Sequence, residues 1–313
     1  MYYTEQREIK MKMKIITTEN QWGTLILEFS KKTFKYQCPT LLCIRNSKII
    51  FLFSARNSLN QAEIHLGSYD FIGCNFELIK ENFIDLAKLN ILHAVGILPG
   101  NVINKKIDEY YMICTIFTFE REFTANLYYI SFRLNNFDCI ILEITKLIFI
   151  ESRFRSTAEL VHVDNKIKIF YTMESIVTER ERKDFPNYYS IYSVDLSTNW
   201  VQNGDEIAIF SEYLRRKYCL TKPSILQSLE KGNELWFSGR DALRGSNYFI
   251  SRIFMKDNFE GTNFTKLSKV YLHPTLHSTK MQCYPEIFSH NGVKKLLFSG
   301  SDYGEGGIFL CEE

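Results

Sequence analysis

The chain has 313 residues, of which 45% are hydrophobic, and a formal net charge of +2. Its 15 Gly and 6 Pro are too few for a disordered, collagen-like or low-complexity chain. So small a net charge indicates neither a nucleic-acid nor a membrane partner, and no apolar run approaches the roughly 18 residues of a membrane helix. Aromatic residues make up 15% of the chain, which favours a β-rich fold.

Eight cysteines are spread along the chain, and no two of them form a CxxC pair. Several lie inside apolar runs, which is typical of buried thiols in a reducing compartment rather than of a disulfide framework. The amino-terminal segment MYYTEQREIKMKMK is charged and lacks the apolar core of about 7–15 residues that a secretory signal contains. We therefore expect a cytoplasmic protein.

Five similar segments are phased along the chain. Each begins with a short apolar strand, continues through a polar turn, and ends with a second apolar strand that closes in Ser or Thr. Successive segments start 60, 59, 65 and 62 residues apart, and four of the five start at a proline. The segments begin at Pro39, Pro99, Ala158, Pro223 and Pro285.

Further apolar stretches follow each of these hairpins, for example residues 188–196 and 200–210 after the third. Four short strands repeated five times predict an all-β, five-bladed β-propeller with four antiparallel strands per blade, as a single domain over residues 1–313. A proline suits the first residue of a strand. We expect short helical turns only within 74–92 and 213–218. The alternative is a β-sandwich whose prolines are evenly spaced by coincidence.

A propeller gathers side chains from every blade around one end of its axis. In an antiparallel hairpin the start of the first strand lies beside the end of the second, so both contribute to the same rim. Carboxylate pairs at this rim suit acid/base work on a glycosidic bond, and Arg suits anionic groups. The rim candidates are Gln37, Cys38, Arg56, Asn57, His93, Leu98, Phe119, Glu120, Ser156, Glu159, Glu174, Thr221, Lys222, Arg240, Asp241, Cys283, Tyr284, Glu286, Asp302 and Tyr303.

Two of the segments carry more specific motifs. CLTKPSIL followed by ELWFSGRD, over residues 219–241, resembles an Arg-Pro-Ser blade opening followed by Trp-Tyr-Ser-Tyr-Arg-Gly. CYPEIF followed by LLFSGSDYGEGGIFL, over residues 283–310, is similar to Tyr-Pro followed by Tyr-Asn-Gly-Asn-x-Tyr-Gly-x-x-Gly. With the blade openings, these motifs resemble the five-bladed propeller glycoside hydrolases of the family 43 type. They are most similar to a subgroup associated with polysaccharide-biosynthesis gene clusters.

The resemblance implies a set of acidic groups near the axis: a general base, a general acid, and a third that orients the acid. The base is commonly an Asp directly before the first blade's proline, where this chain has Cys38. For the remaining positions the resemblance implies catalytic carboxyl groups at Glu159, Asp302 and Asp241, in that order of preference. Together with the rim positions, it predicts substrate-binding groups at Arg56, His93, Lys222, Arg240, Tyr284 and Tyr303.

The implied function is that of a carbohydrate-active, glycosidase-like enzyme. It would cleave or transfer a glycosyl group in surface-polysaccharide or sugar-conjugate metabolism, with a carbohydrate or nucleotide sugar as ligand. The alternative is a non-catalytic sugar-binding or scaffold propeller, which Cys38 in place of the base favours. A role in protein–protein contacts alone has no specific residue to support it.

We expect no cofactor and no metal. The chain has no Walker loop and no GxGxxG motif after a strand. His273, His277 and Cys283 are spaced like zinc ligands, but a fourth ligand is missing. A nucleophilic cysteine near the axis would need a neighbouring base and a lowered pKa.

Overall fold

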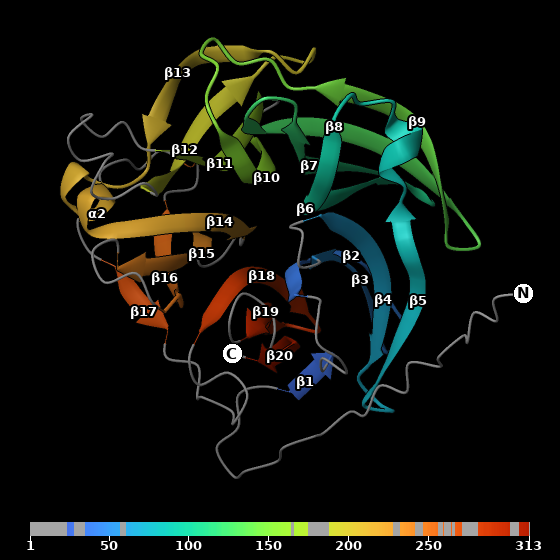
Figure 1. The fold of residues 1–313 in the computed structure, drawn as a ribbon. Helices are drawn as coiled ribbons and strands as arrows, with labels where there is room; N and C mark the ends of the chain where they lie inside the picture. Colours follow the sequence, from blue (N-terminus) through green and yellow to red (C-terminus); the bar gives the residue numbers. More distant parts are fainter. Residues whose placement is uncertain are drawn as a thin grey trace, which may run out of the picture.

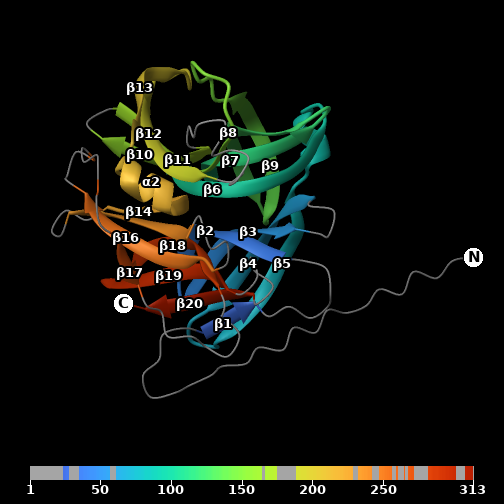
Figure 2. The ribbon, with the colours of Figure 1, turned by 60° about the vertical axis from the view of Figure 1, so that its left-hand side comes forward.

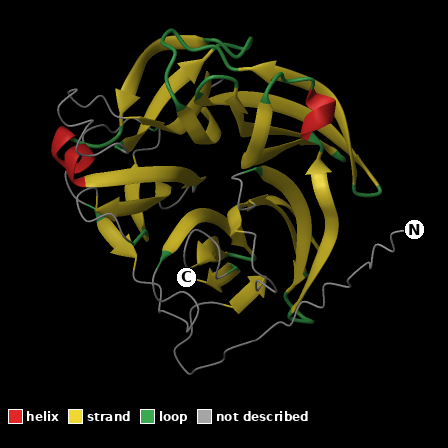
Figure 3. Ribbon diagram, viewed as in Figure 1, coloured by secondary structure: helices red, strands yellow, loops and turns green. Residues whose placement is uncertain are grey.

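The computed structural model describes residues 24–27, 35–56, 61–163, 166–174, 188–227, 232–241, 247–255, 259, 264, 267–270, 281–300 and 307–312. These residues are nearly all in β-strands (Figure 3). One 3-10 turn, η1 (Leu86–Leu89), and one short helix, α2 (Glu212–Lys217), lie where the sequence predicted helical turns. Neither described helix has the length and apolar character needed to cross a membrane.

The strands form antiparallel groups of four in chain order. The first group is β2 (Lys35–Arg45), β3 (Lys48–Arg56), β4 (Ala62–Asp70) and β5 (Asn75–Ile84). The second is β6 (Ala94–Lys106), β7 (Glu109–Phe119), β8 (Phe123–Asn135) and β9 (Asp138–Lys146). A single parallel bridge between Ala62 and Gly96 joins these two groups into one eight-stranded sheet.

The other groups are separate four-stranded sheets. The third is β10 (Arg155–Val163), β11 (Lys166–Glu174), β12 (Tyr189–Leu196) and β13 (Gln202–Ala208), and the fourth is β14 (Tyr218–Leu226), β15 (Asn233–Asp241), β16 (Phe249–Met255) and β17 (Ser268–Val270). The fifth contains β18 (Gln282–His290), β19 (Val293–Gly300) and β20 (Ile308–Glu312), with β1 (Thr24–Leu27) paired to β20. The first and last described strands of the chain thus share one sheet.

The groups surround a common centre, with the first strand of each group nearest to it (Figure 1). These first strands contact one another in a cycle: β2 with β6, β6 with β10, β10 with β14, β14 with β18, and β18 with β2. The helix α2 lies against β14 at the outside (Figure 2). Ser211 caps it by accepting a hydrogen bond from the Leu214 amide.

The prolines lie inside the first strands, not at their beginnings as the sequence suggested. Pro39, Pro223 and Pro285 each fall within a shift of the strand register, and in β6 such a shift follows Pro99. A bulge leaves one residue out of the ladder, so a residue without an N–H is tolerated there. The predicted pairing of strand ends is confirmed: Lys35 at the start of β2 pairs with Arg56 at the end of β3. We call the side where first strands begin and second strands end the rim face.

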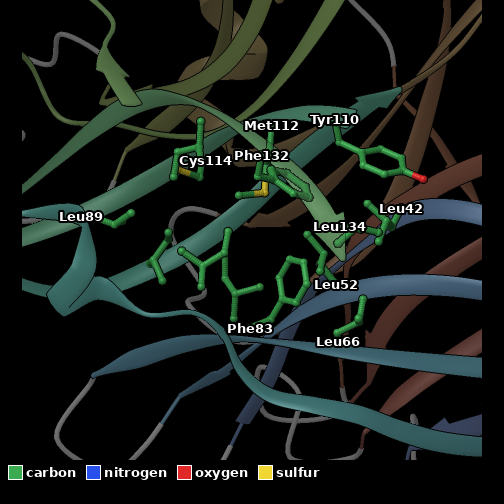
Figure 4. Packing of buried hydrophobic residues seen from close by; sticks show 14 of the residues in the cluster. Leu42, Leu52, Leu66, Phe83, Leu89, Tyr110, Met112, Cys114, Phe132 and Leu134 are labelled. Carbon is green, nitrogen blue, oxygen red and sulfur yellow. The ribbon is translucent and has the colours of Figure 1, made fainter. Parts of the chain in front are cut away.

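Apolar side chains fill the spaces between neighbouring groups. The largest such cluster lies between the first two groups, where β3 and β4 face β7 and β8 (Figure 4). Leu52, Met112 and Phe132 are fully buried in it, and Phe83 packs edge-on against Phe132 at 5.8 Å between ring centroids. Strands alternate their side chains between two faces, so a group packed on both sides needs apolar residues on both, which explains the abundance of Phe and Ile.

Candidate functional site at the centre of the strand groups

Four first strands share a strained residue at the same place. Cys38, Thr157, Lys222 and Tyr284 have φ angles of 51°, 41°, 51° and 57°, and each directly precedes the proline or alanine that marks its repeat. Left-handed backbone is uncommon for side chains of this size and for β-branched Thr. Such strain persists only where the surroundings fix it, and it gathers at functional sites.

The amide of this residue is held by the neighbouring strand group. In three cases its N–H donates to a Ser or Thr hydroxyl at the end of the preceding group's second strand. The bonds are Thr157 N to Thr115 Oγ1 (2.8 Å), Lys222 N to Thr172 Oγ1 (3.0 Å) and Tyr284 N to Ser238 Oγ (2.7 Å). In these three hairpins the Ser or Thr near the end of the second strand therefore ties one group to the next and orients the central residues.

A buried ion pair lies at the centre. The Lys222 side chain is fully buried, and its Nζ lies 3.4 Å from Oε2 of Glu286, whose side chain is 8% exposed. Glu286 also accepts hydrogen bonds from the Ser224 hydroxyl to Oε2 (3.4 Å) and from the Leu41 amide to Oε1 (3.1 Å). Glu286 is thus surrounded by three donors, which favour its ionised form.

Glu159 is the second carboxyl group of the cluster. It is 7% exposed, and its Oε2 has no hydrogen-bond partner. Burial, together with the neighbouring Glu286, raises the pKa of Glu159 well above its usual value, although Lys222 and the Ile225 amide act in the opposite direction. Lys222 is ion-paired with Glu286, whereas burial and the nearby Glu286 favour the protonated form of Glu159.

The ammonium of Lys222 is stabilised by both acids. Burial by itself would lower the pKa of Lys222, but Glu286 and Glu159 raise it above its ordinary value. Burial also raises the pKa of Glu286, and Lys222 opposes that shift most strongly. The cluster of Lys222, Glu286 and Glu159, which we call the axial cluster, therefore holds two buried carboxyl groups in different surroundings: Glu286 is ion-paired with Lys222, and Glu159 Oε2 has no hydrogen-bond partner.

Cys38 borders this cluster as a neutral thiol. It is fully buried, and burial raises its pKa to about 12 despite the nearby charges of Lys222 and Arg56. Burial likewise raises the pKa of Cys283 well above its ordinary value. All eight cysteines are free thiols. A protonated thiol is neither a base nor a strong nucleophile, so the burial of Cys38 disfavours a nucleophilic role for it.

The structure brings together several residues that the sequence nominated. Glu159 and Lys222 belong to the axial cluster, and Tyr284 adjoins it: its pKa is raised by burial and by Cys283 and Cys38, and lowered by Arg56. Arg240 and Asp241 end β15 on the rim face, where the Arg240 guanidinium lies 5.4 Å from the Tyr248 ring centroid.

Other nominated residues lie elsewhere. His93 is half exposed, and its Nε2 lies 4.0 Å from Glu120 Oε1. His93 therefore contacts Glu120 rather than the axial cluster. Asn57, Asp302, Tyr303, His273 and His277 lie outside the described residues. No group of three or more His, Cys, Asp or Glu in the described ranges has a metal-binding arrangement.

Glu286 is the central residue that the choice of catalytic candidates missed. It follows Tyr284 by two residues, as Glu159 follows Thr157, so both acids hold the same place relative to the left-handed residue. An alignment of the five repeats on Pro39, Pro99, Ala158, Pro223 and Pro285 places Glu159 and Glu286 at equivalent positions. The family resemblance instead favours Asp241 and Asp302, at the ends of second strands, as the further catalytic acids.

The raised pKa of Glu159 predicts a pH-dependent stability. The folded chain binds one proton more than the unfolded chain between the ordinary and the raised pKa of Glu159. This contribution is complete below about pH 4.3, and it is lost at up to about 1.4 kcal/mol per pH unit as the pH rises. Glu159→Gln cannot titrate, so we expect the wild type to lose stability relative to this variant between about pH 5 and 7.

Urea unfolding of both proteins across this range measures the difference. Glu77→Gln is the matched control, because the Glu77 side chain is 61% exposed on β5, and it should leave the wild-type dependence unchanged. Parallel pH profiles for the wild type and Glu159→Gln would contradict a buried, protonated Glu159.

Comparisons with known proteins support the fold. No protein-family model and no curated protein sequence matches the chain. Among solved structures, a glycoside hydrolase is similar over 97% of this chain and 92% of its own, at 10% identity and a TM-score of 0.68. A thermostable family-43 glycoside hydrolase is similar over 90% and 89%, at 12% identity and a TM-score of 0.63.

A third similar structure is a Bacillus subtilis levansucrase variant in complex with oligosaccharides. It is similar over 91% of this chain and 86% of its own, at 8% identity and a TM-score of 0.62. These structures are propellers, and the chain shares their fold. The predicted propeller fold of the family-43 type is thereby confirmed at the level of architecture.

Proposed function

We propose that residues 1–313 form a single five-bladed β-propeller with four antiparallel strands per blade, whose hairpins open near residues 39, 99, 158, 223 and 285. The support is the cycle of contacts among β2, β6, β10, β14 and β18, together with the strand order within each group. The pairing of β1 with β20 would complete the fifth blade.

We infer that the protein is a carbohydrate-active, glycosidase-like enzyme that cleaves or transfers a glycosyl group. The observation that carries this proposal is the pair of buried carboxyl groups at the centre: Glu286 is ion-paired with Lys222, and Glu159 has an unpartnered Oε2 and a raised pKa. Two carboxyl groups held in different protonation states supply a proton donor and a negative charge at one site, which glycosidic bond cleavage requires.

In this proposal Glu159 gives its proton to the glycosidic oxygen as the bond between that oxygen and the anomeric carbon breaks. The positive charge that develops on the sugar is stabilised by the Glu286 carboxylate. A water molecule or an acceptor hydroxyl then bonds to the anomeric carbon, and its proton returns to Glu159. Arg56, Arg240 and Tyr284 are the proposed substrate-binding groups of the rim face. His93 and Tyr303 are further binding candidates, and Asp241 and Asp302 are further carboxyl candidates.

The biological setting belongs to the same proposal. We place the enzyme in the cytoplasm, in surface-polysaccharide or sugar-conjugate metabolism, with a carbohydrate or nucleotide sugar as its ligand. Eight free thiols suit a reducing compartment. The solved glycoside hydrolases and the levansucrase bound to oligosaccharides suit a carbohydrate ligand.

The test begins with a thermal-shift screen against nucleotide sugars, acidic sugars and arabino- and fructo-oligosaccharides, with and without phosphate. A ligand at 100 times its dissociation constant should stabilise the fold by about 2.7 kcal/mol. Turnover of each hit is then measured with the wild type and with Glu159→Gln. We expect the variant to lose about 10²–10⁴-fold in kcat, which is the usual contribution of a proton donor, while Glu77→Gln retains full activity. Unchanged turnover in Glu159→Gln would exclude Glu159 as the proton donor.

A second candidate function is a non-catalytic sugar-binding propeller. Cys38 favours it, because this buried neutral thiol stands where the resembling hydrolases keep their base. Complete burial of Lys222 also favours a structural role for the central ion pair. Binding of a sugar without turnover by the wild type would select this candidate.

A further inference from the structure

A row of aromatic rings crosses the rim face from the second strand group to the third. Phe117 and Phe123 stack with ring centroids 5.1 Å apart and an interplanar angle of 17°. Phe154 lies 6.4 Å from each of them, and Tyr189 lies 5.7 Å from Phe154. The rings come from β7, β8, the segment before β10, and the start of β12. We call these four residues the aromatic row.

The row is open to solvent at its outer part. Phe123 is 45% exposed, and Phe119, its partner across the β7–β8 turn, is 54% exposed. Single exposed hydrophobic residues are normal on a protein surface, but a contiguous set of rings on a functional face marks a place where something binds. Aromatic rings are also common in the lining of small-molecule sites.

The row begins at the axial site. Phe117 packs against a cluster formed by Cys38, Ala62 and Leu98, and Tyr284 packs against the same cluster. Phe117 pairs with Gly96 near the start of β6, which places it on the rim face. One end of the row is therefore continuous with the side chains that border Lys222 and Glu286.

The other end reaches the fourth strand group. Tyr189 lies on β12, which contacts β14 of the fourth group, and the Arg240 charge opposes the rise in the pKa of Tyr189 that burial and Glu174 cause. The His93–Glu120 pair stands beside Phe119, whose amide bonds to the His93 carbonyl at 2.9 Å. Polar and charged side chains thus accompany the rings and supply partners for hydroxyl groups.

We propose that the aromatic row holds a glycan chain, so that the ligand of the axial site is an oligosaccharide of several units rather than a single sugar. The C–H faces of sugar rings are apolar and pack on aromatic faces, while the hydroxyl groups at their edges need polar partners. The row and its flanking polar groups offer both. This inference rests on the proposed carbohydrate function of the axial site.

The experiment compares affinities along a series of chain lengths. Arabino- and fructo-oligosaccharides of one to six units are titrated calorimetrically into the wild type, Phe123→Ala and Phe254→Ala. Phe254 is the matched control, because it is 56% exposed and pairs with Glu234 near the start of β15, at the opposite end from the rim face. For one of the two series we expect the wild type to bind longer chains more tightly. We expect Phe123→Ala to bind the longest chains with about tenfold lower affinity and the monosaccharide with unchanged affinity.

The outcomes separate this inference from the proposed catalysis. Length-dependent binding that Phe123→Ala abolishes supports the aromatic row even if the wild type shows no turnover. Equal affinity for all lengths, an equal loss in Phe254→Ala, or no binding by any probe overturns it, even if Glu159→Gln abolishes turnover of another substrate. Conversion of a wild-type dimer to a monomer by Phe123→Ala, seen by sedimentation, would assign the row to self-association and overturn it as well.

Discussion

Replacement of Lys222 by Met is expected to lower the free energy of unfolding by about 3–5 kcal/mol at pH 7. Lys222 is fully buried, and its ammonium is the cation closest to Glu286 in the axial cluster. Removing one partner of a buried pair leaves the other charge uncompensated in a low-dielectric interior. Met keeps the unbranched shape and has the same difficulty with the left-handed backbone, so the change isolates the charge.

Two further variants make the result specific. Lys222→Met combined with Glu286→Gln removes both charges and should recover at least half of the loss, because an uncharged pair needs no counterion. Lys48→Met removes an exposed ion pair with Glu77, at 3.7 Å between Nζ and Oε2, and should change stability by less than about 1 kcal/mol. Urea unfolding measures all three. A loss below about 1 kcal/mol for Lys222→Met would show that the pair contributes little to the fold.

The same ion pair connects stability with the proposed chemistry. The Lys222 charge favours the ionised form of Glu286, whereas burial and the charge on Glu286 favour the protonated form of Glu159. A single cation in the cluster therefore acts differently on two chemically identical side chains. Loss of Lys222 would favour the protonated form of both acids, so the stability of the fold and the proposed proton donor depend on the same residue.

The periodic features of the fold could be predicted from the sequence. Strands, turns and the phase of the repeat follow from local patterns, and so does the side on which strand ends meet. The serine or threonine at the end of each second strand was visible as a repeated feature. The structural role of this hydroxyl could not be predicted, because Thr172 accepts its hydrogen bond from the amide of Lys222, which lies 50 residues further along the chain.

The features that were missed depend on distant parts of the chain. β1 is a four-residue stretch outside the repeat, and its pairing with β20 at the other end of the chain leaves no local signal. Lys222 and Glu286 are 64 residues apart, and each lies at the register shift of its own first strand. A proline has no N–H to donate to the strand ladder, so the sequence alone predicts it at the start of a strand. A bulge also leaves a residue unpaired, so a proline is tolerated there inside a strand.

Replacement of Gly100 by Ala is expected to destabilise the protein by about 3 kcal/mol or more. A β-carbon on Gly100 would lie 2.3 Å from the carbonyl oxygen of Ile113 and 2.5 Å from that of Ala158. Both atoms belong to the backbone of packed strands, β7 and β10, and neither can move without shifting its strand. The space between the second and third strand groups therefore admits only a hydrogen at this position.

Gly67→Ala is the informative comparison, because its β-carbon would also clash, at 2.6 Å, but with the ring of Phe76. A ring can rotate or shift, so the expected loss is only about 1 kcal/mol. Urea unfolding of the two variants tests whether backbone contact, rather than crowding alone, decides the cost, and equal losses would contradict this. Because Ala158 directly precedes Glu159, Gly100→Ala should also displace Glu159, the proposed proton donor. Any activity of the wild type should then fall further in Gly100→Ala than in Gly67→Ala, even at temperatures where both remain folded.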